Sequence, residues 1–305
     1  MRGLSKALVL PALAATLAGA SDPKWLLPVA SMDPYLPIRN SALQFDLGVS
    51  HTSASGFYAG KSDDSAKKAV PGKLTGTDDS AFTSAASINQ FSLKVRHGFV
   101  ASTEAVAELP FYMASGAAQR TKPNDENAPQ ASGVGDLSLG VKSVYEPWGL
   151  GAYFGLLLPV GSDAYTHGDG QVNIGIMEDY TWNNMFTVMS NFVFGYNLPA
   201  VNGRIDQQHN WSGLLRFQGE FVERKYRPYL AVNYEGRGEY KENDVVLADG
   251  GYRVLLTPGI DATLFGDFSG ELSFPIVLVG SGNQMLATAN GWSVNFALKY
   301  FWFRF

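Results

Sequence analysis

Residues 291–305 read Gly291-Trp-Ser-Val-Asn-Phe-Ala-Leu-Lys-Tyr-Phe-Trp-Phe-Arg-Phe305, and this stretch decides the fold. Large apolar side chains occupy every second position from Trp292 to Trp302, and small or polar residues fill the positions between them as far as Lys299. Because successive side chains of a strand point to opposite faces, this period of two predicts a β-strand with one apolar face. A strand of about 15 residues, at roughly 3.3 Å each, exceeds ordinary soluble strands and suits a tilted crossing of a bilayer.

The same stretch ends in three aromatic residues, Phe301, Phe303 and Phe305. An aromatic-rich final strand ending in Phe resembles the C-terminal assembly signal of bacterial outer-membrane β-barrels, which implies recognition by the barrel assembly machinery. These three residues, however, share the odd parity of Lys299, whereas the apolar face uses even positions. Either a β-bulge near Lys299 changes the register, or the final residues cross the periplasmic interface with aromatics on both faces. We expect the second, because membrane interfaces accept aromatic belts.

The other end of the chain predicts export. Arg2 and Lys6 precede an apolar run over 7–17, and the small residues Ala18-Gly19-Ala20 follow. This pattern is typical of a secretory signal peptide over 1–20, whereas a membrane-anchoring helix would need a longer run without Pro11. Residues 21–40 are rich in proline and form an irregular periplasmic segment, either a loose tail or a shallow tuck that plugs the barrel mouth. The barrel itself is predicted over 41–305.

The composition excludes several classes of protein. Cysteine is absent, so disulfides and a lipoprotein anchor are excluded. Removing Arg2 and Lys6 with the signal peptide changes the formal net charge from −5 to −7, which argues against a nucleic-acid partner. A mean hydropathy of −0.05 with 13% aromatic residues is natural for a barrel, because lipid-facing apolar residues alternate with polar ones that face the lumen.

Eleven further segments show the same alternation of apolar and polar residues. They are expected at about 41–51, 87–98, 104–114, 133–145, 150–160, 171–181, 185–197, 210–221, 228–235, 251–264 and 268–279. The connections alternate between long and short, with long loops at about 52–86, 115–132, 161–170, 198–209, 236–250 and 280–290. A periplasmic β-sandwich has no reason to gather its long loops at one end, whereas an outer-membrane barrel does. The sequence therefore predicts an all-β, transmembrane, antiparallel up-and-down β-barrel of about 12 strands, with short periplasmic turns and long extracellular loops.

Four tryptophans support this arrangement, because they fall at or near predicted strand ends: Trp148, Trp182, Trp292 and Trp302. Tryptophan is enriched where a membrane protein crosses the lipid–water interface. Outer-membrane lipid and lipopolysaccharide are the partners expected for such a surface.

Two short motifs carry a resemblance to a known family. Pro37-Ile-Arg-Asn40 precedes the first strand, and Gly133-Val-Gly-Asp-Leu-Ser-Leu-Gly-Val-Lys142 opens the fourth. They resemble a family of bacterial porin-like outer-membrane proteins related to the meta-pathway phenol-degradation barrels. The resemblance implies an outer-membrane barrel with a transport role, and it supplies no catalytic residues.

Charged residues at inward parity are the main candidates for function, because charge is tolerated in the lumen and not on the lipid face. The set comprises Lys94, Arg96, Glu104, Glu108, Asp136, Lys142, Arg216, Glu220, Arg253, Asp261 and Glu271. If opposite charges line separate walls, they create a field that selects small solutes, and the protein is a channel or transporter. If they pair across the lumen, the bore is braced and blocked, and the protein is a structural or surface-display barrel.

A lipid-modifying enzyme is a third alternative, and its best candidate is the run His209-Asn-Trp-Ser212. We expect no enzyme, because Ser212 is predicted to face inward while His209 lies in a loop, and nothing orients the imidazole. Gly133-Val-Gly-Asp136 is followed by a strand in place of the helix that a phosphate-binding loop requires. The loop acids Asp63-Asp64, Asp78-Asp79 and Asp163 with Asp169 lack the spacing of a dedicated calcium site. No cofactor or metal is expected.

Overall fold

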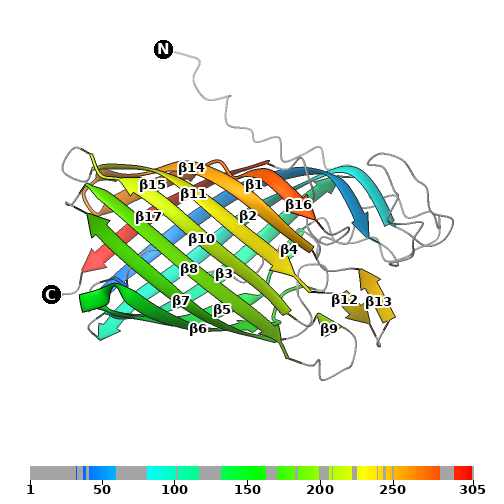
Figure 1. The fold of residues 1–305 in the computed structure, drawn as a ribbon, viewed down its shortest axis with the longest axis horizontal. Helices are drawn as coiled ribbons and strands as arrows, with labels where there is room; N and C mark the ends of the chain where they lie inside the picture. The colour runs from blue at the N-terminus through cyan, green and yellow to red at the C-terminus, as the bar shows by residue number, and fades with distance from the viewer. Residues whose placement is uncertain are drawn as a thin grey trace, which may run out of the picture.

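The chain folds into a closed antiparallel β-barrel in the computed structural model (Figure 1). The structure describes residues 32, 37–38, 41–59, 81–100, 102–116, 132–162, 170–182, 185–198, 206–207, 209–221, 225–238, 240–242, 245–248, 251–281 and 292–303. Within these ranges no helix has the length and apolar character to span a membrane.

The barrel wall consists of strands that pair in chain order. They are β1 (Ala42–Ala59), β2 (Ala81–Val100), β3 (Thr103–Gly116), β4 (Ser132–Val134), β5 (Leu137–Tyr145), β6 (Leu150–Leu158), β7 (Gln171–Trp182), β8 (Phe186–Asn197), β10 (His209–Gly219), β11 (Tyr226–Arg237), β14 (Gly251–Phe265), β15 (Phe268–Ser273), β16 (Ile276–Ser281) and β17 (Trp292–Phe303). The pairing of β1 with β17 closes the wall. Since β4 and β5 share one crossing, as do β15 and β16, the predicted barrel of 12 strands is confirmed.

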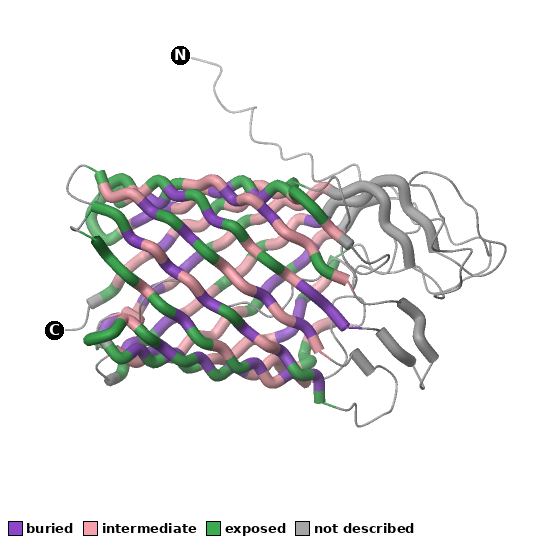
Figure 2. The backbone as a smooth tube through the Cα atoms, viewed as in Figure 1, coloured by how far each residue is buried: buried purple, intermediate pink, exposed green. Residues whose placement is uncertain are grey.

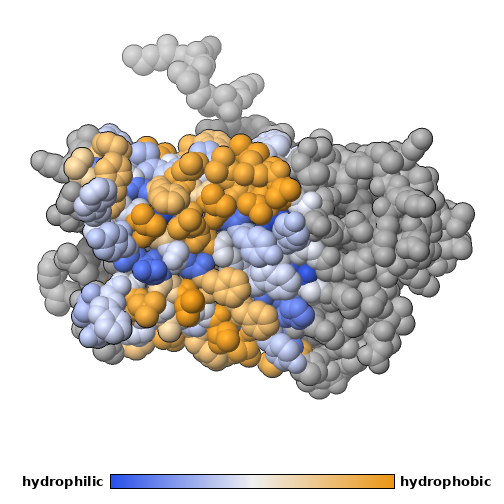
Figure 3. Space-filling model, viewed as in Figure 1, coloured by the Kyte–Doolittle hydropathy of each residue, from blue (hydrophilic) through white to orange (hydrophobic). Residues whose placement is uncertain are grey.

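The two faces of the wall differ as the period of two predicts. Buried and exposed residues alternate along each strand (Figure 2), and apolar side chains cover much of the outer surface (Figure 3). Val141, Phe154 and Ile174 lie side by side on β5, β6 and β7 and are 42%, 50% and 55% exposed. A row of apolar side chains on the outside of a closed barrel is the surface that lipid requires.

Aromatic residues also lie outside, near the strand ends. Trp148 follows β5 in a short 3-10 turn (Glu146–Trp148), Trp182 ends β7, and Trp292 begins β17. All three are exposed, and so is Trp302. The connection between the strands predicted at 133–145 and 150–160 is therefore short, and its tryptophan is exposed and available to an interface.

The hairpin of β1 and β2 extends beyond the predicted strand ends. Its ladder continues from Ser53 opposite Ser87 to Ala59 opposite Ala81, within the segment predicted to be a long loop (Figure 1). Small and polar residues dominate this part of the hairpin. Because these residues do not alternate between apolar and polar, the period-two pattern did not predict that the two strands continue here.

Two more predictions of strands and loops were wrong. The segment over 268–279 is broken at Phe274 and Pro275 into β15 and β16, because proline has no N–H to donate to the ladder. The loops predicted at 198–209 and 236–250 contribute β9 (Asp206–Gln207), β12 (Tyr240–Glu242) and β13 (Val245–Ala248), which form a separate three-stranded sheet. Because β9 and β12 come from loops that are distant in sequence, no local sequence pattern predicts their pairing.

The structure also shows whether a β-bulge changes the register near Lys299, at the aromatic end of β17. The ladder between β1 and β17 runs without a register shift from Trp292 to Phe303. Trp302 is exposed, and Phe301 lines a cavity inside the barrel. The side chain of Phe303 and the whole of Phe305 lie outside the described residues.

Gly135 separates β4 from β5 and lies against Tyr112 of β3, which is buried. A Cβ atom at this glycine would meet the Tyr112 ring at 2.4 Å and Pro110 at 2.9 Å. The absence of a side chain at this position of the 133–142 motif therefore permits close packing against Tyr112. The nucleotide-loop alternative lacks its helix, because β5 follows.

We expect Gly135→Ala to lower the free energy of unfolding by about 1–3 kcal/mol, because the added Cβ atom forces Tyr112 out of its packed position. The measurement is urea unfolding of the barrel in detergent, followed by tryptophan fluorescence. Gly213→Ala is the matched control, since its Cβ would make only ordinary contacts at 3.6 Å. Equal effects of the two substitutions would contradict the assigned packing.

Candidate functional site

The lumen of the barrel is polar, and its charged residues form clusters. The first cluster surrounds Glu104 of β3, which is fully buried. Glu104 accepts from Arg96 of β2, with Nη2 and Oε2 2.9 Å apart, and its Oε1 lies 3.0 Å from Nζ of Lys142 on β5. Arg96 also donates to Gln44 of β1. Two buried cations thus share one buried carboxylate in this Glu104 cluster.

The second cluster surrounds Lys299 of β17. Its Nζ atom lies 2.7 Å from Oε2 of Glu271 on β15 and 3.0 Å from Oδ2 of Asp261 on β14. Asp261 also pairs with Arg227 of β11. Glu271 pairs with Arg216 of β10, with Nη1 and Oε1 3.1 Å apart. The Lys299 cluster, formed by these five residues, holds three cations and two carboxylates.

An aromatic ring supports this second cluster. Tyr229 of β11 donates its hydroxyl to Oε1 of Glu271 at 2.8 Å, and the guanidinium carbon of Arg216 lies 3.4 Å from the centre of the Tyr229 ring. Stacking on the ring and bonding to the carboxylate together restrict the position of Arg216.

The remaining charged residues of the predicted set also have partners. Lys94 pairs with Glu108 at 3.1 Å, and Arg253 pairs with Glu235 at 2.7 Å. Asp136 is buried and accepts from the backbone N–H of Gly161 at 3.1 Å. Glu220, directly after β10, accepts from the hydroxyl of Thr187 at 3.3 Å.

Most of these ion pairs join adjacent strands. Glu104 lies opposite Lys142, Glu108 opposite Lys94, and Arg253 opposite Glu235 in their ladders. Directly opposite residues on one face of an antiparallel pair are the natural partners for opposite charges. Arg216 and Glu271 are an exception, because two strands lie between them. The ion pairs therefore brace the wall mainly along its circumference.

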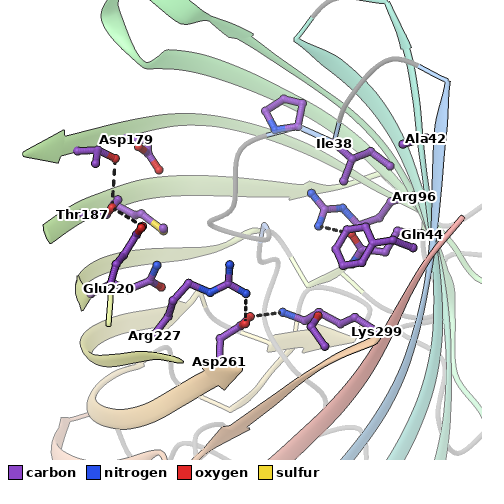
Figure 4. A pocket seen from close by; sticks show the side chains of 16 residues that line it. Ile38, Ala42, Gln44, Arg96, Asp179, Thr187, Glu220, Arg227, Asp261 and Lys299 are labelled. Atoms are coloured by element: carbon purple, nitrogen blue, oxygen red, sulfur yellow. Dashed lines mark hydrogen bonds and ion pairs between the residues drawn. The ribbon is translucent and has the colours of Figure 1, made fainter. Parts of the chain in front are cut away.

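Two cavities lie inside the barrel beside these clusters. The central cavity has a volume of about 260 Å³ and includes Lys94, Arg216, Tyr229 and Glu271 in its lining. The short-turn cavity, named for the end of the barrel at which it lies, has a volume of about 450 Å³ (Figure 4). Its lining comprises Pro37, Ile38, Ala42, Gln44, Arg96, Asp179, Thr181, Thr187, Met189, Gln218, Glu220, Arg227, Asp261, Ser269, Lys299 and Phe301. Lys299 lines both cavities.

Described residues of the N-terminal segment lie within the barrel. Met32 is buried with Val144, Tyr153, Met177 and Val193, and its carbonyl accepts from the Asn191 side chain at 3.2 Å. The N–H of Ile38 donates to Oε2 of Glu104 at 2.8 Å. Met32 and Ile38 do not belong to a loose tail, because packing and hydrogen bonds hold them inside the barrel wall.

Sequence reasoning missed several charged residues of the lumen. Lys299 and Asp46 have inward parity but were left out of the predicted set, although their period-two pattern could have included them. Arg227 was assigned to a turn at 222–227, but β11 already begins at Tyr226. The side chain of Arg227 therefore faces the lumen, where it pairs with Asp261. Glu235, the partner of Arg253, was also left out of the predicted set.

The geometry of His209 and Ser212 does not support the lipid-modifying enzyme. His209 is the first residue of β10 and not a loop residue, and it stacks between Phe194 and Trp211 at ring distances of 5.9 and 5.6 Å. Ser212 has the opposite parity and is buried. The described residues contain no group of three metal-binding side chains, and the predicted acidic loop pairs lie outside them.

A closed 12-stranded wall with an apolar outside, a charged inside and short turns at one end defines an outer-membrane β-barrel. The sequence matches the family described as "Putative MetA-pathway of phenol degradation" over residues 59–274. The chain belongs to this family. A search of curated protein sequences gave no match.

Solved structures share the fold. An outer-membrane channel from Pseudomonas putida F1 superposes with a TM-score of 0.68 at 13% identity, covering 90% of this chain and all of that one. The translocator domain of the autotransporter NalP from Neisseria meningitidis matches with a TM-score of 0.48 at 11% identity, covering 88% and 91% of the two chains. The first match supports the barrel assignment at full length, and the second is too distant to add to it.

Proposed function

We propose that this barrel is an outer-membrane channel that passes small solutes through its charged lumen. The observation that carries the proposal is the pair of cavities inside the wall, lined by charged residues on several strands. Charged rings in a water-filled bore select solutes by sign and orientation. The fold shared with the Pseudomonas putida channel supports the same class of function.

The export and assembly of the protein follow from the same proposal. The signal peptide over 1–20 directs the chain to the periplasm, and Phe301, Phe303 and Phe305 present the final strand to the barrel assembly machinery. The apolar outer surface then contacts outer-membrane lipid and lipopolysaccharide. The transported solute is a small molecule, and neither an enzymatic step nor a cofactor is required.

Conductance across a planar lipid bilayer tests the channel. We expect discrete single-channel steps from the refolded mature protein, and larger steps from a variant lacking residues 21–40. The deletion removes Met32 and Ile38, which occupy space inside the wall. An absence of steps from both proteins, with correct folding shown by circular dichroism, would refute the channel.

A blocked structural or surface-display barrel is the second candidate, and Met32 is the observation that favours it. Met32 is buried among inward side chains and its carbonyl accepts a hydrogen bond from Asn191, which supports a filled bore. Small barrels commonly fill their interior in this way. On this alternative the shortened protein conducts while the complete mature protein does not.

A further inference from the structure

We propose that the short-turn cavity binds a small zwitterion, a solute that carries an ammonium and a carboxylate group on an apolar body. This inference deepens the proposed channel function by naming a solute class. Binding itself does not require conduction, so the two can fail separately. The argument rests on how charge is distributed around the cavity.

One side of the cavity is a carboxylate wall formed by Asp179, Thr181, Thr187 and Glu220 (Figure 4). The side chain of Thr181 hydrogen-bonds to Asp179, and its hydroxyl lies 3.1 Å from that of Thr187. Thr187 in turn donates to Glu220 at 3.3 Å. A chain of hydroxyls therefore joins two carboxylates from β7 and β10, and this wall carries two negative charges.

The opposite side carries the two charge clusters. The Glu104 cluster reaches the cavity through Arg96, and the Lys299 cluster reaches it through Lys299, whereas Arg227 of that cluster lies on β11 beside Glu220 and pairs with Asp261 (Figure 4). Two cations against one carboxylate leave the first cluster with one positive charge. Three cations against two carboxylates leave the second with another. Asp46 accepts from Gln44 and lies directly opposite Lys299 in the β1–β17 ladder, so its carboxylate offsets one of these two positive charges.

The short-turn cavity therefore has two carboxylates on one side and a net positive charge of one on the other. Such an arrangement creates a field across the cavity, which protein walls of low dielectric strengthen. A zwitterion can place its ammonium toward Asp179 and Glu220 and its carboxylate toward Arg96 and Lys299. A solute with a single charge satisfies only one wall and leaves its neutral end against the other.

The remaining lining fits the body of such a solute. Ile38, Met189 and Phe301 add apolar surface to the lining. The volume of about 450 Å³ lies within the range of about 300–1,000 Å³ that is typical of small-molecule sites. A divalent metal is a poorer occupant, because no group of three metal-binding residues occurs among the described residues.

Isothermal titration calorimetry on the folded mature protein in detergent tests the inference. The probes are phenylalanine, phenethylamine, 3-phenylpropionate and benzyl alcohol, which share a ring and carry both charges, one charge or none. We expect phenylalanine to bind at least tenfold more tightly than either singly charged probe, because each charged hydrogen bond is worth about one power of ten or more. Equal affinities, or no binding of phenylalanine, would overturn the proposal.

Substitutions on the two walls separate the contributions of the two charges. In the Asp179→Asn/Glu220→Gln variant we expect phenylalanine to bind no better than 3-phenylpropionate. In Lys299→Gln we expect it to bind no better than phenethylamine, because Lys299 is a cation on the side opposite Asp179 and Glu220. Glu178→Gln is the matched control, because Glu178 neighbours Asp179 on β7 but is exposed on the outer face. A loss of binding in this control, or unchanged phenylalanine selectivity in both wall variants, would refute the site.

The same probes distinguish this inference from the channel itself. Single-channel steps without selective binding of phenylalanine would refute the zwitterion site and leave the channel intact. Selective binding by a protein that never conducts, with or without residues 21–40, would refute the channel and leave the site intact.

Discussion

Replacing Glu104 with Gln is expected to lower the free energy of unfolding by about 3–5 kcal/mol. The carboxylate is fully buried and is shared by Arg96 and Lys142, which are themselves buried. A neutral side chain at this position removes the negative charge that Arg96 and Lys142 share, and both cations stay buried from solvent. It also weakens the bond from the N–H of Ile38. The effect is large because a buried charge cannot recover its lost hydration.

Urea unfolding in detergent, followed by tryptophan fluorescence, measures this loss. Glu108→Gln is the matched control, since Glu108 lies on the same strand and pairs with Lys94 while both side chains remain about one quarter exposed. Its expected cost is below about 1 kcal/mol, because solvent screens an exposed pair. A cost for Glu104→Gln as small as that of the control would show that the Glu104 cluster is hydrated.

A further variant separates uncompensated charge from lost packing. Replacing Glu104 with Leu together with Arg96→Met and Lys142→Met removes all three charges and keeps much of the volume. We expect this triple variant to recover most of the stability that Glu104→Gln loses, because well-packed apolar residues can replace a buried ionic group. Failure to recover would assign the loss to geometry specific to these side chains.

Phe154→Arg is expected to destabilise the barrel in phospholipid vesicles by about 2–4 kcal/mol. Phe154 lies at the centre of β6, between Val141 and Ile174, and half of it is exposed on the outer face. An arginine there must either enter hydrocarbon or draw water toward it. The loss is measured by urea unfolding in vesicles.

Trp148→Arg is the control for this prediction, because Trp148 lies in the turn after β5 and is 74% exposed. At an interface the expected cost of arginine is only about 0–1 kcal/mol. Equal costs at the two positions would contradict a bilayer crossing centred on β6.

The alternation of faces could be predicted because it is a local property. Whether Phe154 or Tyr153 faces outward depends only on the parity of positions within one strand. The same local rule gave the number of crossings, since each crossing must carry its own run of lipid-facing residues. It failed at Phe274-Pro275 and along the outer part of the β1–β2 hairpin, where the pattern is interrupted or absent.

The partners of the charged residues could not be predicted in this way. Parity placed Glu271 and Arg216 on the inner face, but two strands separate β10 from β15, and only closure of the barrel brings the side chains within 3.1 Å. The contacts of Met32 depend on the same closure, because its neighbours come from β5, β6, β7 and β8. A pattern read along the chain contains no information about such distances.

The sequence by itself determined that the chain forms a barrel with an apolar outside and a charged inside. The period of two over 291–305 indicated the first such strand, and the other segments repeat it. Only the tertiary structure decided that the charges form two clusters, that these clusters face a carboxylate wall, and that Met32 lies within the lumen. The physical reason is that facing is fixed by each strand's own geometry, whereas charge pairing is fixed by register and by closure of the whole wall.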